Sequence, residues 1–126
     1  MNTFAEHSAL LLFAHGSSDP GWAEPFVKLK AAVQVRRPGG MVELAFLERM
    51  QPSFDAAVTM LHERGITQIT VAPIFLAIGG HMRNDLPSLI EANRQRTGIK
   101  FRILPALGEV DMLIAAIADW VTESAS

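Results

Sequence analysis

Two histidines in this chain each follow an apolar run, and each stands beside glycines. His15 follows the run at 10–14, and His81 follows the run at 69–78. Glu48 stands just past a third apolar run. A neutral imidazole can bind a divalent metal or accept a proton near neutral pH. Two histidines and one carboxylate, with coordination positions left open, form a set of ligands suited to a divalent first-row metal.

Strands that alternate with helices would have to position these side chains. Short apolar runs that stop at Gly or Ser are typical of strands buried on both faces, and apolar residues at helical spacing are typical of amphipathic helices. We expect strands at residues 8–14, 41–47, 67–72 and 100–104, and helices at about 23–37, 52–64, 85–96 and 110–121. This alternation predicts an α/β fold of three layers, in which a four-stranded parallel sheet carries helices on both faces.

The expected strand order, 2-1-3-4, brings the three candidate ligands to one edge of the sheet. In such a doubly wound order, ligands bind at the carboxyl ends of the strands beside the switch point, which here lies between the first and third strands. His15 follows the first strand, His81 the third and Glu48 the second. Because adjacent strands lie about 4.8 Å apart, we expect the two imidazoles to meet over one crevice.

Glycines and arginines near these ligands indicate a large and acidic ligand. Gly79 and Gly80 permit close approach to the backbone beside His81. Arg49 and Arg83 stand close to candidate ligands, where each is either a contact for a substrate carboxylate or a surface charge. Seven apolar residues near the same edge could form a wall of the site: Phe13, Phe46, Leu47, Met50, Leu76, Ile78 and Met82.

Several of these residues also have a simpler structural interpretation. His15 could be a turn residue, and Glu48 a solvated surface charge. Asp85 is expected to cap a helix, because Pro87 then falls in the first turn. His62 is expected at a helix end, where a histidine favours the helix dipole, and outside the site.

Composition limits the kind of protein. We expect residues 1–126 to form one domain, with residues 1–7 as a loose terminus. The net charge of -2 provides no overall basic field for nucleic acid or an anionic membrane. The chain has no cysteine, so any metal must be held by histidine and carboxylate. No apolar run approaches the ~18 residues that span a bilayer, and we expect a cytoplasmic protein.

The apolar content is high for a small domain. Hydrophobic residues make up 49% of the chain. This excess indicates either a fully buried sheet or a subunit interface.

Three motifs, taken in order, resemble the class II chelatases of the CbiX/SirB type. They are HGS, AFLE followed by QPS, and the segment PIFLAIGGHMRNDLP from Pro73 to Pro87. The likeness covers about residues 8–122. It implies a chelatase-like lobe that inserts a divalent metal, cobalt, nickel or iron, into sirohydrochlorin. The metal would be a substrate, and no organic cofactor is implied.

The resemblance also implies roles for single residues. In that family the histidine of HGS and the histidine before D-x-P hold the metal and help to remove pyrrole protons, and these positions are His15 and His81 here. Glu48 matches the acidic residue after the second strand. The chain has room for one lobe, so it resembles the short form, which works as a homodimer with the tetrapyrrole in a cleft between lobes.

Other functions fit the sequence less well. A serine hydrolase needs G-x-S-x-G and a Rossmann nucleotide binder needs G-x-G-x-x-G, and neither motif is present. A histidine phosphatase needs an arginine before the histidine, where Ala14 stands. The main alternative is a metal-binding or tetrapyrrole-carrier protein without turnover, which would use the same ligands.

Overall fold

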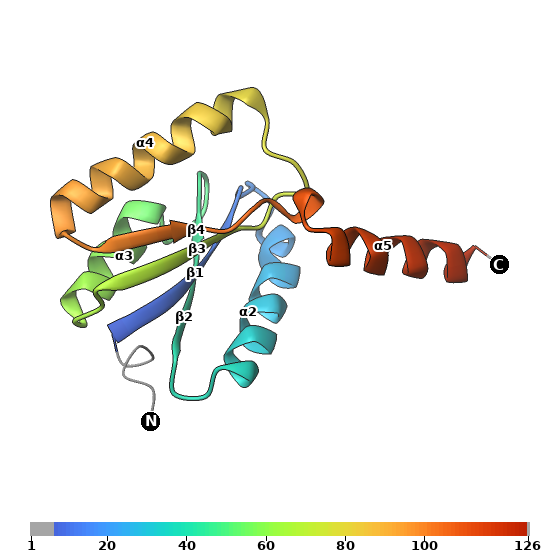
Figure 1. The fold of residues 1–126 in the computed structure, drawn as a ribbon, viewed down its shortest axis with the longest axis horizontal. Helices are drawn as coiled ribbons and strands as arrows, with labels where there is room; N and C mark the ends of the chain where they lie inside the picture. Colours follow the sequence, from blue (N-terminus) through green and yellow to red (C-terminus); the bar gives the residue numbers. More distant parts are fainter. Residues whose placement is uncertain (1–6, 126) are drawn as a thin grey trace.

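The computed structural model describes residues 7–125, apart from the side chain of His81. Its strands are β1 (Ser8–Ala14), β2 (Met41–Phe46), β3 (Gln68–Pro73) and β4 (Lys100–Ile103). Its helices are α2 (Glu24–Arg36), α3 (Phe54–Glu63), α4 (Gly80–Thr97) and α5 (Asp111–Ser124), with the short 3-10 turns η1 (Pro20–Ala23) and η2 (Leu107–Glu109). The predicted alternation of strands and helices is confirmed (Figure 1). Of the segment expected to be a loose terminus, only His7 lies within the described residues.

The four strands form one parallel sheet in the order β2-β1-β3-β4, which confirms the predicted order. β1 lies between β2 and β3, so that Leu11 pairs with Glu43 on one side and Val71 on the other. Leu11 and Phe13 have no exposed surface. A strand with neighbours on both sides and helices on both faces must be apolar throughout, which explains the run in β1.

Helices cover both faces of the sheet (Figure 1). α3 and α4 cover one face, called here the α3–α4 face, and α2 covers part of the other, called here the α2 face. On the α3–α4 face, the ring of Phe13 packs edge-on against Phe54 at 5.0 Å and Phe75 at 6.0 Å. On the α2 face, Leu12 and Phe46 pack with partly buried residues of α2. No helix within residues 7–125 is long and apolar enough to span a membrane.

α3 begins where a serine provides the cap. The Ser53 hydroxyl accepts a hydrogen bond from the Ala56 N–H at 3.1 Å, which satisfies one of the free donors of the first turn. The buried residues of the helix recur at helical spacing: Phe54, Ala57, Val58 and Leu61. α3 therefore places one continuous apolar stripe on the sheet.

α4 begins earlier than the sequence suggested. The prediction placed its start at Asp85, but the helix begins at Gly80, with Gly79 as the N-cap. Asp85 therefore lies inside the helix, and the expectation that it caps the helix was wrong. Glycine is a good N-cap residue, so a helix can start directly after Gly79. Pro87 lies within the helix, not in its first turn.

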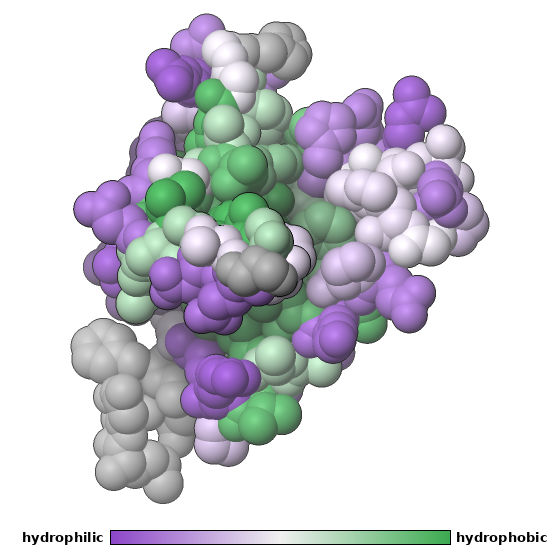
Figure 2. All heavy atoms as spheres, turned by 90° about the vertical axis from the view of Figure 1, so that its right-hand side faces the viewer, coloured by the Kyte–Doolittle hydropathy of each residue, from purple (hydrophilic) through white to green (hydrophobic). Residues whose placement is uncertain are grey.

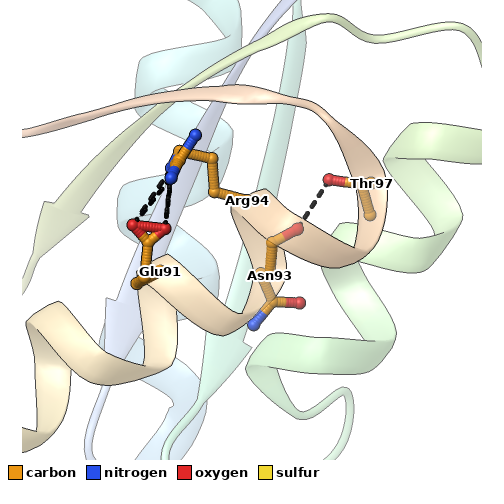
Figure 3. Close-up of polar contacts among 4 residues, drawn as sticks. All are labelled: Glu91, Asn93, Arg94 and Thr97. Atoms are coloured by element: carbon orange, nitrogen blue, oxygen red, sulfur yellow. Dashed lines mark hydrogen bonds and ion pairs between the residues drawn. The ribbon is translucent and has the colours of Figure 1, made fainter.

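The second half of α4 is held by polar contacts (Figure 3). The Arg94 guanidinium donates two hydrogen bonds of 2.8 Å to the Glu91 carboxylate, and the Thr97 hydroxyl donates to the Asn93 carbonyl. The Asn93 side chain, which is 1% exposed, donates to the Asp55 carboxylate of α3 at 2.8 Å. The Asn93–Asp55 bond joins α4 to α3, whereas the Arg94–Glu91 and Thr97–Asn93 contacts lie within α4.

The last helix was predicted, but its position was not. α5 extends away from the sheet (Figure 1), and none of its residues is buried. Two backbone hydrogen bonds fix the turn before it, because the N–H groups of Leu107 and Gly108 donate to the carbonyls of Phe75 and Leu76 at 2.9 and 2.7 Å.

Candidate active site at the carboxyl edge of the sheet

The ends of β1 and β2 hold His15 beside Glu48. Past the strands, the Leu47 N–H donates to the Ala14 carbonyl at 2.9 Å, and the Glu48 N–H donates to the His15 carbonyl at 3.1 Å. His15 Nδ1 and Glu48 Oε1 are 3.7 Å apart, and both side chains are about half exposed, at 52% and 50%. An exposed ion pair contributes little to folding stability. The structure thus brings two of the three predicted ligands together.

Gly16 makes this approach of the two loops possible. Its φ of +98° lies in the region that favours glycine, and a Cβ atom at this position would lie 1.8 Å from the Glu48 carbonyl oxygen. No other residue fits between the loops without moving Glu48.

A cavity of about 480 Å³ opens at this edge. Its described lining comes from the ends of β1 and β2, from the segment after β3 and from the start of α4: His15, Leu47, Glu48, Phe75, Ala77, Ile78, Gly79, Met82 and Asp85. The Phe75 ring stands edge-on to the His15 ring, with 6.2 Å between the centroids. The cavity therefore combines an apolar wall with a histidine and two carboxylates, as expected of a ligand site.

The expected apolar wall is only partly present. Three of its seven candidates line the cavity: Leu47, Ile78 and Met82. Phe13 and Phe46 are instead buried in the core, and Leu76 is exposed. Met50 lines a different groove, between α2 and β2.

Of the four predicted substrate-binding residues, one lies in the described lining of the cavity and three do not. Gly79 lines the cavity. Gly80, Arg49 and Arg83 are exposed and are not part of the cavity's described lining. Arg49 has a φ of 66°, in the left-handed region. The contacts of these residues with substrate stay predictions.

His81 is the second residue of α4, between the glycine that starts the helix and Met82. Its side chain lies outside the described part of the structure, so the predicted meeting of the two imidazoles stays a prediction. Among the side chains that the structure describes, no three of His, Cys, Asp and Glu lie close enough to hold a metal. A metal site with three protein ligands that includes His15 and Glu48 therefore needs a third ligand other than the described His, Cys, Asp and Glu side chains.

Asp85 has a different place from the predicted one. It lines the cavity from within α4 instead of capping the helix. Spacing could have revealed it, because positions 81 and 85 are one helical turn apart and share a helix face once the helix starts at Gly80.

The fold and the cavity define an α/β lobe that presents a histidine and two carboxylates at the carboxyl edge of a parallel sheet. A family model described as CbiX matches residues 9–124, and the chain belongs to the CbiX family.

Two relatives in sequence are named sirohydrochlorin cobaltochelatase. The protein of Saccharolobus solfataricus (strain P2) is 33% identical over 92 residues, which are 73% of this chain and 70% of that protein. The protein of Sulfolobus acidocaldarius is 33% identical over 90 residues, which are 71% of this chain and 72% of that protein. The predicted resemblance is confirmed.

Solved structures agree with the family. The CbiX protein from Marinobacter aquaeolei VT8 superposes with a TM-score of 0.84 and 36% identity, over 93% of this chain and 96% of that chain. The sirohydrochlorin chelatase SirB from Bacillus subtilis subspecies spizizenii, in complex with cobalt, superposes with a TM-score of 0.79 and 20% identity, over 92% of this chain and 50% of that chain. The second likeness shows the fold alone, and this chain spans half of SirB.

Proposed function

We propose that this chain is a sirohydrochlorin chelatase, a lyase-type enzyme that inserts a divalent metal into the tetrapyrrole. The observation that carries the proposal is the His15–Glu48 pair on the wall of a cavity of about 480 Å³, in a lobe of the CbiX family. The names of the relatives support sirohydrochlorin as the acceptor and cobalt as the metal. Histidine and carboxylate ligands also accept nickel and iron.

The His15–Glu48 pair suits the proton chemistry of insertion. Two pyrrole protons leave as one divalent cation enters the macrocycle, so the site must accept protons as well as metal. A neutral imidazole at His15 can do either. At 3.7 Å from His15 Nδ1, the Glu48 carboxylate is too far for a hydrogen bond. It is close enough to stabilise the charge that the ring gains with a proton.

His81 is proposed as the second metal-binding and proton-accepting histidine. Met82 and Asp85 of the same helix line the cavity, and position 81 shares a helix face with position 85. With Glu48, two histidines would leave coordination positions open for pyrrole nitrogens. A closed set of four protein ligands would retain the metal.

Substrate binding is proposed to use glycines and arginines around the metal. Gly79 and Gly80 carry no side chain where a flat macrocycle would approach α4. Sirohydrochlorin carries many carboxylates, which Arg49 and Arg83 can bind as exposed cations.

A homodimer of single-domain chains in the cytoplasm is proposed as the working form. The chain spans half of SirB, which supports a single lobe here. A macrocycle has two faces and one lobe offers one wall, so a second copy would complete the cleft.

Turnover separates the enzyme from the carrier alternative. Sirohydrochlorin and Co²⁺ are mixed in excess over the protein, and the absorption spectrum is followed. We expect many equivalents of cobalt product per chain, at a rate proportional to protein concentration. A rate equal to that of the protein-free mixture, or conversion that stops at one equivalent, would favour the carrier.

A further inference from the structure

The His15 ring is exposed enough to move unless a neighbour holds it. The side chain is 52% exposed, and 3.7 Å separates its Nδ1 from Glu48 Oε1, which is longer than a hydrogen bond. The torsion about the Cβ–Cγ bond of a histidine has broad minima. A group that binds a metal at one point must be held by its surroundings. The ring of His15 therefore needs a second contact.

Phe75 stands beside this ring because the register of β1 and β3 continues past the ends of the strands. Phe13 pairs with Pro73 in the sheet, and the Ile74 N–H donates to the Phe13 carbonyl at 2.8 Å. Two positions further along, the same register sets Phe75 opposite His15. The two rings lie at an interplanar angle of 84°, with 6.2 Å between their centroids. This is the edge-to-face geometry that ring pairs favour.

Phe75 is itself fixed on two sides. Its ring stands edge-on to the fully buried Phe13 ring, with 6.0 Å between the centroids. Its backbone carbonyl accepts a hydrogen bond from the Leu107 N–H at 2.9 Å. Phe13, Phe75 and His15 thus form a row of rings that leads from the core to the cavity. Because a protein core is close-packed, this row gives the exposed histidine a rigid support.

The wall around Phe75 is mainly apolar. Residues 74–79 link β3 to α4, and the turn before α5 is bonded to this segment. Viewed along α5, a continuous apolar surface rises from the base of that helix towards the start of α4 (Figure 2). Apolar side chains have no hydrogen-bonding groups, so this wall can orient an imidazole only by packing against it.

Holding the ring also selects the atom that faces a metal. Nδ1 of His15 lies on the side of Glu48, and Nε2 lies on the far side of the five-membered ring. Phe75 restricts the plane of the ring, and the Glu48 carboxylate favours a nitrogen over a carbon on its own side. Together the two contacts leave Nε2 as the nitrogen for the metal.

We infer that Phe75 is a positioning residue of metal insertion, whose ring holds the His15 imidazole so that Nε2 is presented to the metal. The inference rests on the proposed function and deepens it, because it names a residue that acts through His15. Phe75 also lines the cavity. The experiments below therefore separate positioning from substrate binding and from folding.

Phe75→Leu is compared with Phe101→Leu, which makes the same change in the same hydrophobic cluster. Phe101 packs against Phe54 and is not part of the cavity's described lining. We expect Phe75→Leu to lower kcat for cobalt insertion about tenfold and to change KM for sirohydrochlorin by less than about twofold, because catalysis falls steeply when a group is misplaced. We expect kcat to stay unchanged in Phe101→Leu.

An aromatic replacement tests whether the ring itself is needed. Phe75→Tyr keeps a ring beside His15, and we expect it to retain at least about half of the unchanged kcat. An equal loss of kcat in Phe75→Tyr and Phe75→Leu would overturn the inference. A higher KM with an unchanged kcat in Phe75→Leu would also overturn it, because Phe75 would then contribute only to substrate binding.

Cobalt binding without the tetrapyrrole reports on the metal ligand alone. Co²⁺ is titrated into the unchanged chain, Phe75→Leu and Phe101→Leu, and the dissociation constants are measured by calorimetry. We expect the dissociation constant to rise about threefold or more in Phe75→Leu, because binding must then order a freer ring. We expect no change in Phe101→Leu. Equal constants in all three proteins would contradict the positioning role.

These measurements distinguish the inference from the proposed function. If the unchanged chain and Phe75→Leu insert cobalt at the same rate, the positioning role ends and the proposed function stands. If the unchanged chain binds Co²⁺ without inserting it, and Phe75→Leu binds it more weakly, the proposed function ends. Phe75 would then still position His15, as a ligand in a metal carrier.

Discussion

The α3–α4 face of the sheet and its carboxyl edge use polar side chains in opposite ways. On the α3–α4 face, Asn93 is buried and bonded to Asp55, among apolar residues that close the core. At the carboxyl edge, His15 and Glu48 are half exposed on the wall of a cavity. Buried polar groups that are hydrogen-bonded to each other stabilise a fold. Polar groups that are exposed in a cavity can bind a ligand. We therefore expect substitutions on the α3–α4 face to lower stability, and substitutions at the carboxyl edge to lower activity.

The largest loss of stability is expected for Phe13→Ala. Phe13 is fully buried and packs against Phe54 and Phe75, only two positions before His15. Removing the ring leaves a cavity, and we expect the free energy of unfolding to fall by about 3–5 kcal/mol. Urea denaturation followed by circular dichroism measures it, with the exposed Leu76→Ala as control. Equal stability of Phe13→Ala and Leu76→Ala would contradict the conclusion that the buried core, and not the exposed edge, determines stability.

Gly16→Ala is expected to affect both regions at once. The added methyl group would meet the Glu48 carbonyl oxygen at 1.8 Å, at a φ of +98°. We expect a loss of about 1–3 kcal/mol in stability and slower metal insertion, because Glu48 must move. Gly39→Ala is the matched control, since its φ is +82° but a Cβ atom there meets nothing within 4 Å. Equal insertion rates in the two variants would show that the loop contact does not position the site.

Asn93→Ala is expected to lower stability and leave insertion unchanged. The side chain bonds to Asp55 at 2.8 Å and to the Leu89 carbonyl at 2.9 Å. Losing buried hydrogen bonds costs about 1–3 kcal/mol. Denaturation and the insertion rate are measured together, with the exposed Gln95→Ala as control. A slower insertion rate in folded Asn93→Ala protein would show that the α3–α4 face also affects activity, which would contradict the contrast with the carboxyl edge.

The smallest effect is expected at the start of α3. Ser53→Ala removes the cap on the Ala56 N–H and should cost about 1 kcal/mol of stability. Ser88→Ala, which removes an exposed hydroxyl within α4, should change stability less. Thermal unfolding of both variants compares the losses, and an equal or larger loss for Ser88→Ala would contradict the capping role.

The strands were predictable from local patterns, and the His15–Glu48 pair from a strand order that is common in doubly wound sheets. Apolar runs located the strands, and the order of a doubly wound sheet then placed the strand ends together. The start of α4 was missed because a glycine pair can break a helix or cap it. Because the predicted helix started at Asp85, this residue was expected to cap the helix and its place in the cavity was missed.

The position of α5 could not be predicted from its own residues. An amphipathic pattern shows that a helix has an apolar stripe, but it does not say which surface covers the stripe. Here the tight turn at Leu107 and Gly108 decides the direction of the helix, through hydrogen bonds to a segment distant in the sequence.

The central claim, that the histidine at the carboxyl edge carries out metal insertion, is tested most directly by two matched substitutions. His15 lines the cavity, whereas His62 is an exposed histidine at the end of α3, beside a small pocket elsewhere. The initial rate of cobalt insertion into sirohydrochlorin is measured for His15→Ala and His62→Ala. We expect the rate to fall at least about 100-fold for His15→Ala, the scale of lost acid–base catalysis, and to stay unchanged for His62→Ala. An unchanged rate in folded His15→Ala protein would contradict the account.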